Sequence, residues 1–122
     1  MLNLNCVMLG SEDPKALGEF YGKVLEKKPD MEEGGFVGYL AGSAFLSIGA
    51  HDKVNGQNTN PERIMYFFET TEIDKDFNRI KDIPGATVVQ EPYSPGDDGA
   101  MKLATLADPD GNYFQLSTPW NG

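Results

Sequence analysis

Hydrophobic residues in the first half of the chain recur in patterns that predict one helix among strands. In residues 3–9, successive side chains of a strand would point to opposite sides, and both sides would be apolar. This is typical of a strand that packs on two faces. Asp13 and Pro14 form a helix start, and one face of the helix is apolar at spacings of three and four: Leu17, Phe20, Tyr21, Val24 and Leu25. The Lys27-Lys28-Pro29 step is expected to end this helix. Two strands, residues 35–40 and 44–50, and a polar loop over residues 51–61 complete this half.

The second half predicts the same succession of elements. Residues 63–70 form a strand, and Thr71 and Asp74 then form a capping box at the start of a helix. Phe77, Ile80 and Ile83 give this helix its apolar face, and Pro84-Gly85 ends it. Three strands follow, at residues 86–91, 100–107 and 113–117, with a loop rich in proline and glycine over residues 92–99.

The two halves superpose as an internal duplication. Aligning Leu17 with Phe77 and Phe20 with Ile80 gives a period of about 60 residues, which is longer than a solenoid repeat. We therefore expect two β-α-β-β-β modules, at about residues 1–60 and 61–122, in an α+β fold with a mixed sheet. A length of 122 residues predicts that both modules belong to a single domain.

A tight turn precedes the last strand. In Asp108-Pro109-Asp110-Gly111-Asn112, the proline fixes φ at the first turn position and Gly111 supplies the positive φ that completes the reversal. The side chain of Asp110 is expected to accept a hydrogen bond from the backbone that follows it. The segment thus predicts a hairpin that leads into residues 113–117.

Charge and composition exclude several classes of protein. The net charge of −9, from 19 acidic and 10 basic side chains, argues against nucleic-acid binding, which depends on Lys and Arg. It permits a cationic ligand, although acidity also serves simply to keep a protein soluble. No apolar run reaches the roughly 20 residues that span a bilayer, so no membrane partner is expected. The N-terminus has no signal-peptide pattern, and one cysteine excludes an intrachain disulfide, so we expect a cytoplasmic protein.

The common catalytic motifs are missing from the sequence. The 14 glycines form neither a dinucleotide-binding motif nor a phosphate-binding loop, and no serine lies in a nucleophile-elbow sequence. The only histidine, His51, begins the polar loop. Acid–base catalysis and an ordinary surface position are both open for His51.

Two segments together resemble a known group of proteins. The first is the N-terminal block Cys6-Val7-Met8-Leu9-Gly10-Ser11-Glu12-Asp13-Pro14, and the second is the terminal turn with Tyr113-Phe114-Gln115-Leu116. They resemble the vicinal oxygen chelate superfamily, which contains glyoxalases, bleomycin resistance proteins and extradiol dioxygenases. The resemblance implies two modules that build a curved sheet, a ligand on its concave side, and a homodimer.

The resemblance also locates the positions at which metal-using members bind their ion. Those members place a histidine on the first strand of each module and a glutamate on the closing strand, where this chain has Cys6, Met65 and Gln115. Residues 44–50, which supply a further acid in some members, contain none. Thioethers and neutral amides are poor ligands for a divalent transition metal, so no metal site and no cofactor are expected.

Strand alternation extends these three positions to a candidate ligand-binding surface. If they point into the concave side, Leu4 and Met8 join Cys6, Phe67 and Glu69 join Met65, and Tyr113 and Ser117 join Gln115. The candidate ligand-binding residues are Cys6, Met8, Met65, Phe67, Glu69, Tyr113 and Gln115. This composition suits a small, partly apolar molecule, but the same side chains could simply form core. Three roles are open for Trp120: it could cover the pocket, take part in a subunit contact, or only hold the C-terminal tail in place.

Three functions stay open at this point. The first is a metal-free protein that binds or sequesters a small molecule, with a cationic drug of the bleomycin type as the specific candidate. The second is a glyoxalase-like lyase or isomerase, or a dioxygenase, that polarises its substrate on a metal. The third is acid–base catalysis without a metal by Glu69 or Tyr113.

Overall fold

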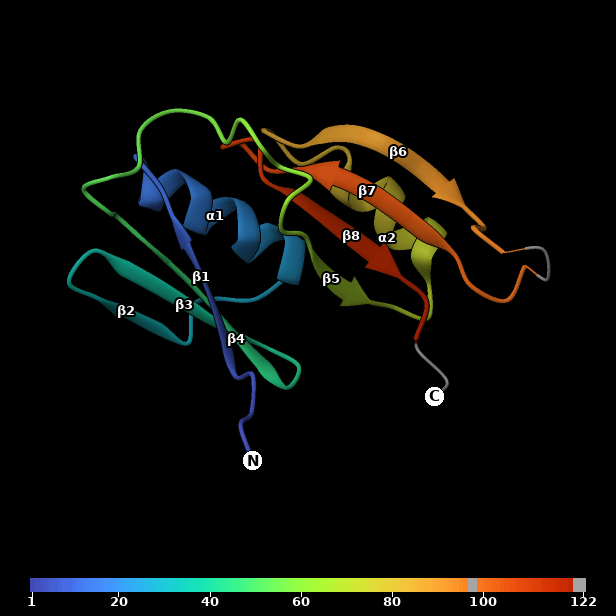
Figure 1. Ribbon diagram of the computed structural model, residues 1–122, viewed down its shortest axis with the longest axis horizontal. Helices are drawn as coiled ribbons and strands as arrows, with labels where there is room; N and C mark the ends of the chain where they lie inside the picture. Colours follow the sequence, from blue (N-terminus) through green and yellow to red (C-terminus); the bar gives the residue numbers. More distant parts are fainter. Residues whose placement is uncertain (97–98, 120–122) are drawn as a thin grey trace. The chain divides into compact units, whose positions relative to one another are not determined.

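The computed structural model describes residues 1–96 and 99–119, and the chain folds into two compact units, Met1–Gly56 and Gln57–Gly122. Unit 1 contains β1 (Cys6–Gly10), α1 (Pro14–Leu25), β2 (Met31–Glu33), β3 (Phe36–Ala41) and β4 (Ala44–Gly49) (Figure 1). Unit 2 contains β5 (Tyr66–Glu69), α2 (Ile73–Ile80), β6 (Thr87–Tyr93), β7 (Leu103–Ala107) and β8 (Tyr113–Ser117). Trp120 lies outside the described residues.

Each unit forms a four-stranded mixed sheet with the same topology. The strand orders are β1-β4-β3-β2 and β5-β8-β7-β6. In both sheets the first strand pairs in parallel with the last, and the other pairs are antiparallel. A helix follows the first strand of each unit, as a crossover between parallel strands requires. The predicted α+β fold of two β-α-β-β-β modules is confirmed, and the single domain stays a prediction.

Helix α1 covers one face of the unit-1 sheet. Its buried side chains include Leu17, Phe20, Tyr21 and Val24, and the sheet contributes Tyr39, Leu46 and Ile48. The predicted cap is confirmed, because Asp13 Oδ1 accepts a hydrogen bond from Ala16 N at 3.2 Å. The helix ends at Leu25, where Glu26 takes a left-handed conformation with a φ of 55°.

Helix α2 packs on β6, β7 and β8 through the apolar face that the sequence predicts, although Ile83 lies beyond its end (Figure 1). Ile73, Phe77 and Ile80 are buried. Tyr66, Phe68 and Phe114 form an aromatic cluster on the sheet, with ring centroids 5.8–6.3 Å apart.

The predicted capping box of α2 is wrong. The helix begins at Ile73, and the capping position, Glu72, makes no side-chain cap bond. Thr70 takes this role from outside the helix, because its Oγ1 accepts from Glu72 N at 3.0 Å and donates to Asp76 Oδ2 at 2.5 Å. Thr70, two positions before the capping residue Glu72, thus takes the place predicted for Thr71 in bonding the backbone.

Several strand boundaries also differ from the prediction. Strand β2 was not expected, because two of its three residues are exposed glutamates that gain their order by pairing with β3. Strand β6 continues to Tyr93, into the predicted loop, and its pairing with β7 is irregular on both sides of Gln90. Strand β1 begins at Cys6 rather than residue 3, since its partner strand β4 begins at Ala44.

The turn before β8 is held by Asp108 and not by Asp110. Asp108 Oδ1 accepts from Asp110 N and Asn112 N, at 2.9 and 3.0 Å, and Oδ2 accepts from Asn112 Nδ2 at 2.9 Å. Gly111 has the predicted positive φ, 84°, and its N–H donates to Asp108 O at 2.9 Å. Asn58, from the polar loop, donates to Asp110 O at 2.8 Å. Within residues 1–96 and 99–119, no helix is long and apolar enough to cross a membrane.

Candidate functional site

Four of the candidate residues on β5 and β8 share one face of the unit-2 sheet. In the parallel pairing, Phe67 lies beside Gln115 and Glu69 beside Ser117, and alternation adds Tyr113 to the same face. On the other neighbour of β8, Thr105 lies beside Gln115. The aromatic cluster occupies the opposite face, toward α2. We call this surface the unit-2 face; its residues are Met65, Phe67, Glu69, Thr105, Tyr113, Gln115 and Ser117.

A short chain of polar contacts fixes Gln115 on the unit-2 face. Thr105 Oγ1 donates to Gln115 Oε1 at 2.9 Å, and Gln115 Nε2 approaches Met65 Sδ at 3.8 Å. Gln115 and Thr105 are each 8% exposed. The structure therefore brings together Met65 and Gln115, two of the three positions that the resemblance singles out.

Sequence reasoning missed Thr105. Alternation along residues 100–107 places Thr105 on one face together with Leu103 and Ala107, and that signal was available. The pairing of β7 with β8 could not be read from the sequence, because a shift of the register by one residue would move every side chain to the other face.

The remaining side chains of the unit-2 face differ in exposure. Phe67 is 45% exposed and Glu69 is exposed, so both reach solvent. Ser117 is fully buried, and its Oγ has no hydrogen-bond partner within the described parts of the chain. The face thus combines an accessible aromatic ring with buried polar groups.

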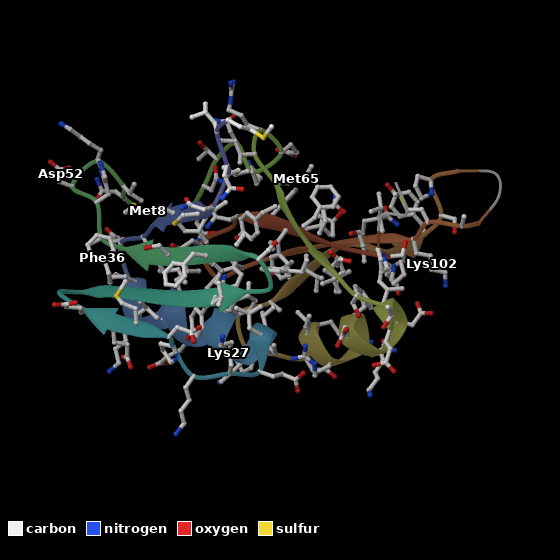
Figure 2. All side chains as sticks on the ribbon, turned by 90° about the horizontal axis from the view of Figure 1, so that it is seen from below. Met8, Lys27, Phe36, Asp52, Met65 and Lys102 are labelled. Carbon is white, nitrogen blue, oxygen red and sulfur yellow. The ribbon has the colours of Figure 1, made fainter. Side chains whose placement is uncertain are left out.

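The other two candidate residues, Cys6 and Met8, lie on the unit-1 sheet opposite α1. Cys6 is in register with Phe45, and Met8 with Ser47. This surface, the unit-1 face, is apolar and accessible: Cys6 is exposed, Met8 is 48% exposed, and Leu40 and Phe36 are 50% and 37% exposed. Met8 and Phe36 of this face are labelled in Figure 2. Its residues are Cys6, Met8, Phe36, Leu40, Phe45 and Ser47.

Two phenylalanine rings of the unit-1 face lie directly over glycines. The ring of Phe45 covers Gly38, and the ring of Phe36 covers Gly49, so closely that a Cβ at either glycine would collide with it. The missing side chains let the rings lie flat on the sheet. Sequence reasoning did not include either ring among the ligand-binding residues, since the cross-strand pairing that juxtaposes ring and glycine is not visible in the sequence.

The residues at the implied metal positions do not fit a divalent transition metal. The Gln115 oxygen already accepts from Thr105, and its amide nitrogen, which has no free lone pair, faces Met65. Met65 offers only a thioether, which is a poor ligand for such an ion. No group of three or more His, Cys, Asp or Glu side chains within the described residues could hold a metal ion.

His51 is an exposed residue of the loop. Its Nδ1 accepts from Lys53 N at 3.0 Å and lies 3.4 Å from Asp52 Oδ1. Its side chain is 52% exposed. These contacts are those of a local turn at the surface, which was one of the two alternatives for this histidine.

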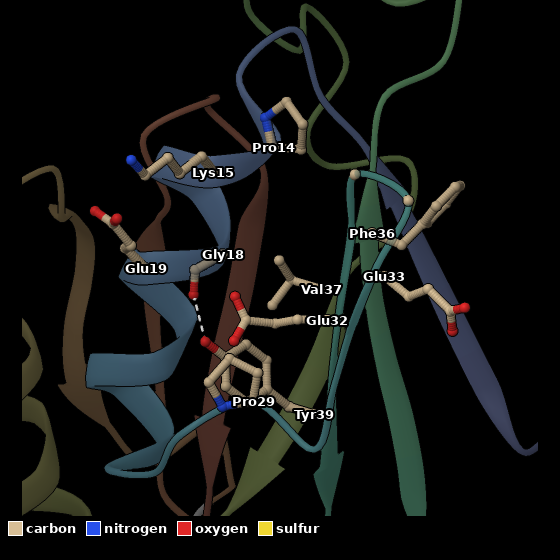
Figure 3. A pocket seen from close by; sticks show the side chains of 12 residues that line it. Pro14, Lys15, Gly18, Glu19, Pro29, Glu32, Glu33, Phe36, Val37 and Tyr39 are labelled. Atoms are coloured by element: carbon tan, nitrogen blue, oxygen red, sulfur yellow. Dashed lines mark hydrogen bonds between the residues drawn. The ribbon is translucent and has the colours of Figure 1, made fainter.

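A separate pocket of about 430 Å³ lies between α1 and the β2–β3 hairpin of unit 1 (Figure 3). Tyr39 and Val37 line it from the sheet, and Tyr39 donates its hydroxyl to Gly18 O at 2.7 Å. Glu32 extends from β2 toward α1, and Glu19 lies on the helix (Figure 3). Burial, and then the negative charges of Glu32 and Glu19, raise the pKa of the Tyr39 hydroxyl.

Comparison with known proteins identifies similar domains. Residues 6–117 match the family model described as a glyoxalase-like domain. No curated protein shows significant similarity to the sequence.

Solved structures with a similar fold include three with descriptive names. A glyoxalase-related enzyme from Fulvimarina pelagi has a TM-score of 0.78 at 17% identity, over 98% of this chain and 89% of that chain. A glyoxalase/bleomycin resistance protein/dioxygenase family enzyme from Burkholderia phytofirmans has a TM-score of 0.77 at 20% identity, over 96% and 98%. A glyoxalase/bleomycin resistance protein from Albidiferax ferrireducens has a TM-score of 0.74 at 20% identity, over 94% of this chain and 98% of that chain. At these identities the likeness shows the fold alone.

Proposed function

We propose that this chain, which belongs to the glyoxalase-like domain family, binds and sequesters a small, partly apolar molecule and does so without a metal ion. Membership confirms the resemblance to the vicinal oxygen chelate superfamily. The ligand would lie on the unit-1 face, which carries Cys6 and Met8, or on the unit-2 face, which carries the other five candidate residues.

The contact network of Gln115 carries this proposal. A carboxylate at this position would offer two acceptor oxygens to an ion, whereas the amide has one oxygen, which already accepts from Thr105, and a nitrogen that offers no lone pair. The accessible apolar side chains point in the same direction, because Met8, Phe36, Leu40 and Phe67 are 37–50% exposed. A mostly apolar surface with few polar groups is typical of small-molecule sites.

Binding is tested by a thermal-shift screen of small molecules, including a cationic drug of the bleomycin type, followed by titration calorimetry of the hits. A ligand of the unit-1 face should raise the melting temperature of the wild type and lose this effect in Met8→Ser, and a ligand of the unit-2 face should lose it in Phe67→Ser. Val88→Ser is the matched control, because Val88 is 41% exposed on β6 and is in register with Leu106, on the side of the sheet opposite the unit-2 face. If the ligand-induced rise in melting temperature were reduced equally in all three variants, the proposed location would be contradicted.

The alternative function is a glyoxalase-like lyase or isomerase, or a dioxygenase, acting through a non-standard site. Metal analysis of the purified protein and a hemithioacetal isomerase assay separate it from the binding function. Stoichiometric zinc, nickel or iron that is lost in Gln115→Leu, or isomerase activity, would replace our proposal with this alternative.

We also propose that the protein forms a homodimer, as the superfamily resemblance implies. The apolar exposure of the unit-1 face supports a partner surface, because contiguous exposed apolar patches commonly mark sites of association. Light scattering coupled to size-exclusion chromatography should give twice the mass of one chain. A monomer at micromolar concentration would refute the dimer and leave the binding proposal intact.

A further inference from the structure

We propose that Gln115 presents its amide N–H groups to an oxygen atom of the ligand, so that the unit-2 face selects an uncharged carbonyl compound with an apolar body. This inference rests on the proposed function, since it names the ligand class of the same face.

The two neighbours of Gln115 determine which way its amide points. A thioether can accept a hydrogen bond but cannot donate one, whereas a hydroxyl can do either. With Oε1 toward Thr105 at 2.9 Å and Nε2 toward Met65 at 3.8 Å, both contacts are favourable. Turning the amide over would set its oxygen against the sulfur, which are two acceptors. The geometry therefore makes Gln115 a donor on the side away from Thr105.

The donor capacity of this amide is largely unused. The nitrogen carries two N–H groups, and its one partner within the described residues is the weakly accepting sulfur of Met65. Gln115 is 8% exposed, so bulk water competes little for these N–H groups. A carbonyl oxygen of a ligand is a stronger acceptor than a thioether and would form the better hydrogen bond.

Ser117 gives an independent indication that a polar group completes this face. It lies two residues beyond Gln115 on the same side of β8, is fully buried, and its Oγ has no partner within the part of the chain described. A buried hydroxyl without a hydrogen bond destabilises the folded protein. A bound oxygen that reaches Ser117 would remove this destabilisation.

The surroundings determine the charge and shape of the ligand. Glu69, in register with Ser117, is exposed, and the whole chain has a net charge of −9, so an anionic carboxylate would be repelled. Phe67 and Met65 offer an aromatic ring and a thioether to an apolar body. An aryl ketone combines the required features.

The test uses acetophenone and α-methylstyrene, which differ only in that the ketone oxygen is replaced by a methylene group. Binding is followed by ¹H–¹⁵N NMR, and the side-chain amide signals of Gln115 report directly on the proposed hydrogen bond. We expect acetophenone to bind about fivefold more tightly than α-methylstyrene, the effect of one neutral hydrogen bond. Only acetophenone should shift the Gln115 amide signals, and benzoate should bind more weakly than acetophenone.

Variants separate the donor from mere packing. Gln115→Glu removes both N–H groups and should abolish the preference for the ketone. Thr105→Val frees the amide to rotate and should reduce the preference while leaving Gln115 in place. Thr71→Val is the matched control, since Thr71 is an exposed residue between β5 and α2 and lies outside the sheet, and it should keep the full preference.

The possible outcomes distinguish this inference from the proposed function. Equal binding of ketone and alkene to the wild type, or a preference that survives in Gln115→Glu, would overturn the inference and leave small-molecule binding intact. If neither probe shifts any signal of the unit-2 face, the inference falls, and so does the claim that this face binds apolar molecules.

Discussion

Thr105 and Gln115 lie opposite each other on antiparallel strands and are joined through their side chains, with Thr105 Oγ1 donating to Gln115 Oε1 at 2.9 Å. The pair is buried, in contact with Met65 on one side. Thr105 thereby determines which atoms of Gln115 are left for a ligand. The chemistry of the unit-2 face depends on this cross-strand contact as much as on the identity of Gln115 itself.

The first prediction concerns the stability of this pair. Thr105→Val leaves the buried Gln115 oxygen without a donor and should lower the free energy of unfolding by about 1–3 kcal/mol. The double variant Thr105→Val/Gln115→Met removes both partners of the hydrogen bond, and its free energy of unfolding should fall less than that of the single variant. Chemical denaturation measures both, and Thr87→Val, expected to lie within about 0.5 kcal/mol of the wild type, is the control. A Thr105→Val protein as stable as this control would show that the contact contributes nothing.

The second prediction compares two glycines of α1. A Cβ at Gly22 would lie 2.6 Å from the Tyr39 hydroxyl, so Gly22→Ala must displace Tyr39 from its bond to Gly18 O. The gain in helix propensity, about 1 kcal/mol, is smaller than the loss from overpacking and the broken bond, about 1–3 kcal/mol. The nearest neighbours of a Cβ at Gly18 would be side-chain atoms of Val37, at 3.3 Å. Urea denaturation should show Gly22→Ala to be less stable than Gly18→Ala, and the reverse order would contradict the role of Gly22.

The third prediction concerns the turn before β8. Asp108 accepts three hydrogen bonds and is 3% exposed, so Asp108→Ala should cost about 3 kcal/mol. Asp110→Asn is the matched comparison, because Asp110 Oδ2 is buried and has no partner within the described residues. Neutralising Asp110 breaks no hydrogen bond of Oδ2 and should lower the free energy of unfolding by less than about 1 kcal/mol. If thermal or chemical denaturation showed the same loss of stability in Asp108→Ala and Asp110→Asn, the turn would not depend on Asp108.

The fourth prediction concerns high pH. Burial, followed by Glu32 and Glu19, raises the pKa of Tyr39 in the folded protein, while the unfolded chain has the ordinary value of about 10. The stability gained by keeping Tyr39 neutral is complete below that ordinary value and is lost as the pH rises through the folded pKa. The Tyr39→Phe variant should be less stable at pH 7 by about 1 kcal/mol, because it lacks the bond to Gly18 O.

Denaturation midpoints measured from neutral pH to above pH 10 test this linkage. The midpoint of the wild type should fall more steeply than that of Tyr39→Phe. Parallel slopes in the two proteins would show that Tyr39 does not ionise with a raised pKa.

The fifth prediction concerns low pH. Asp30 Oδ2 accepts from Lys27 Nζ at 2.6 Å and from Leu40 N at 2.7 Å, and these two bonds lower the pKa of Asp30. The stability that they provide is present above the unfolded pKa of about 3.9 and is lost as the pH falls through the folded pKa. Asp30→Asn should lower the melting temperature at neutral pH and narrow the difference in melting temperature between neutral and acidic pH. An acid dependence identical to that of the wild type would argue against this role for Asp30.

Several features of the fold could be predicted from local patterns alone. The start of α1 follows from Asp13 and Pro14, and its buried face follows from the spacing of Leu17, Phe20 and Val24. The positive φ of Gly111 follows from the requirements of a tight turn. Such features are visible because they depend on residues a few positions apart, whose conformations are restricted whatever the rest of the chain does.

The remaining features were decided by contacts between distant segments. Whether Thr70 or Thr71 caps α2 depended on Asp76, which accepts the Thr70 hydroxyl, and the order of β2 depended on pairing with β3. The sequence by itself determined the modules, the turn and the residue types at the site. Only the tertiary structure decided that Thr105 lies beside Gln115, because the register of two strands is selected by the packing energy of the whole sheet and not by either strand alone.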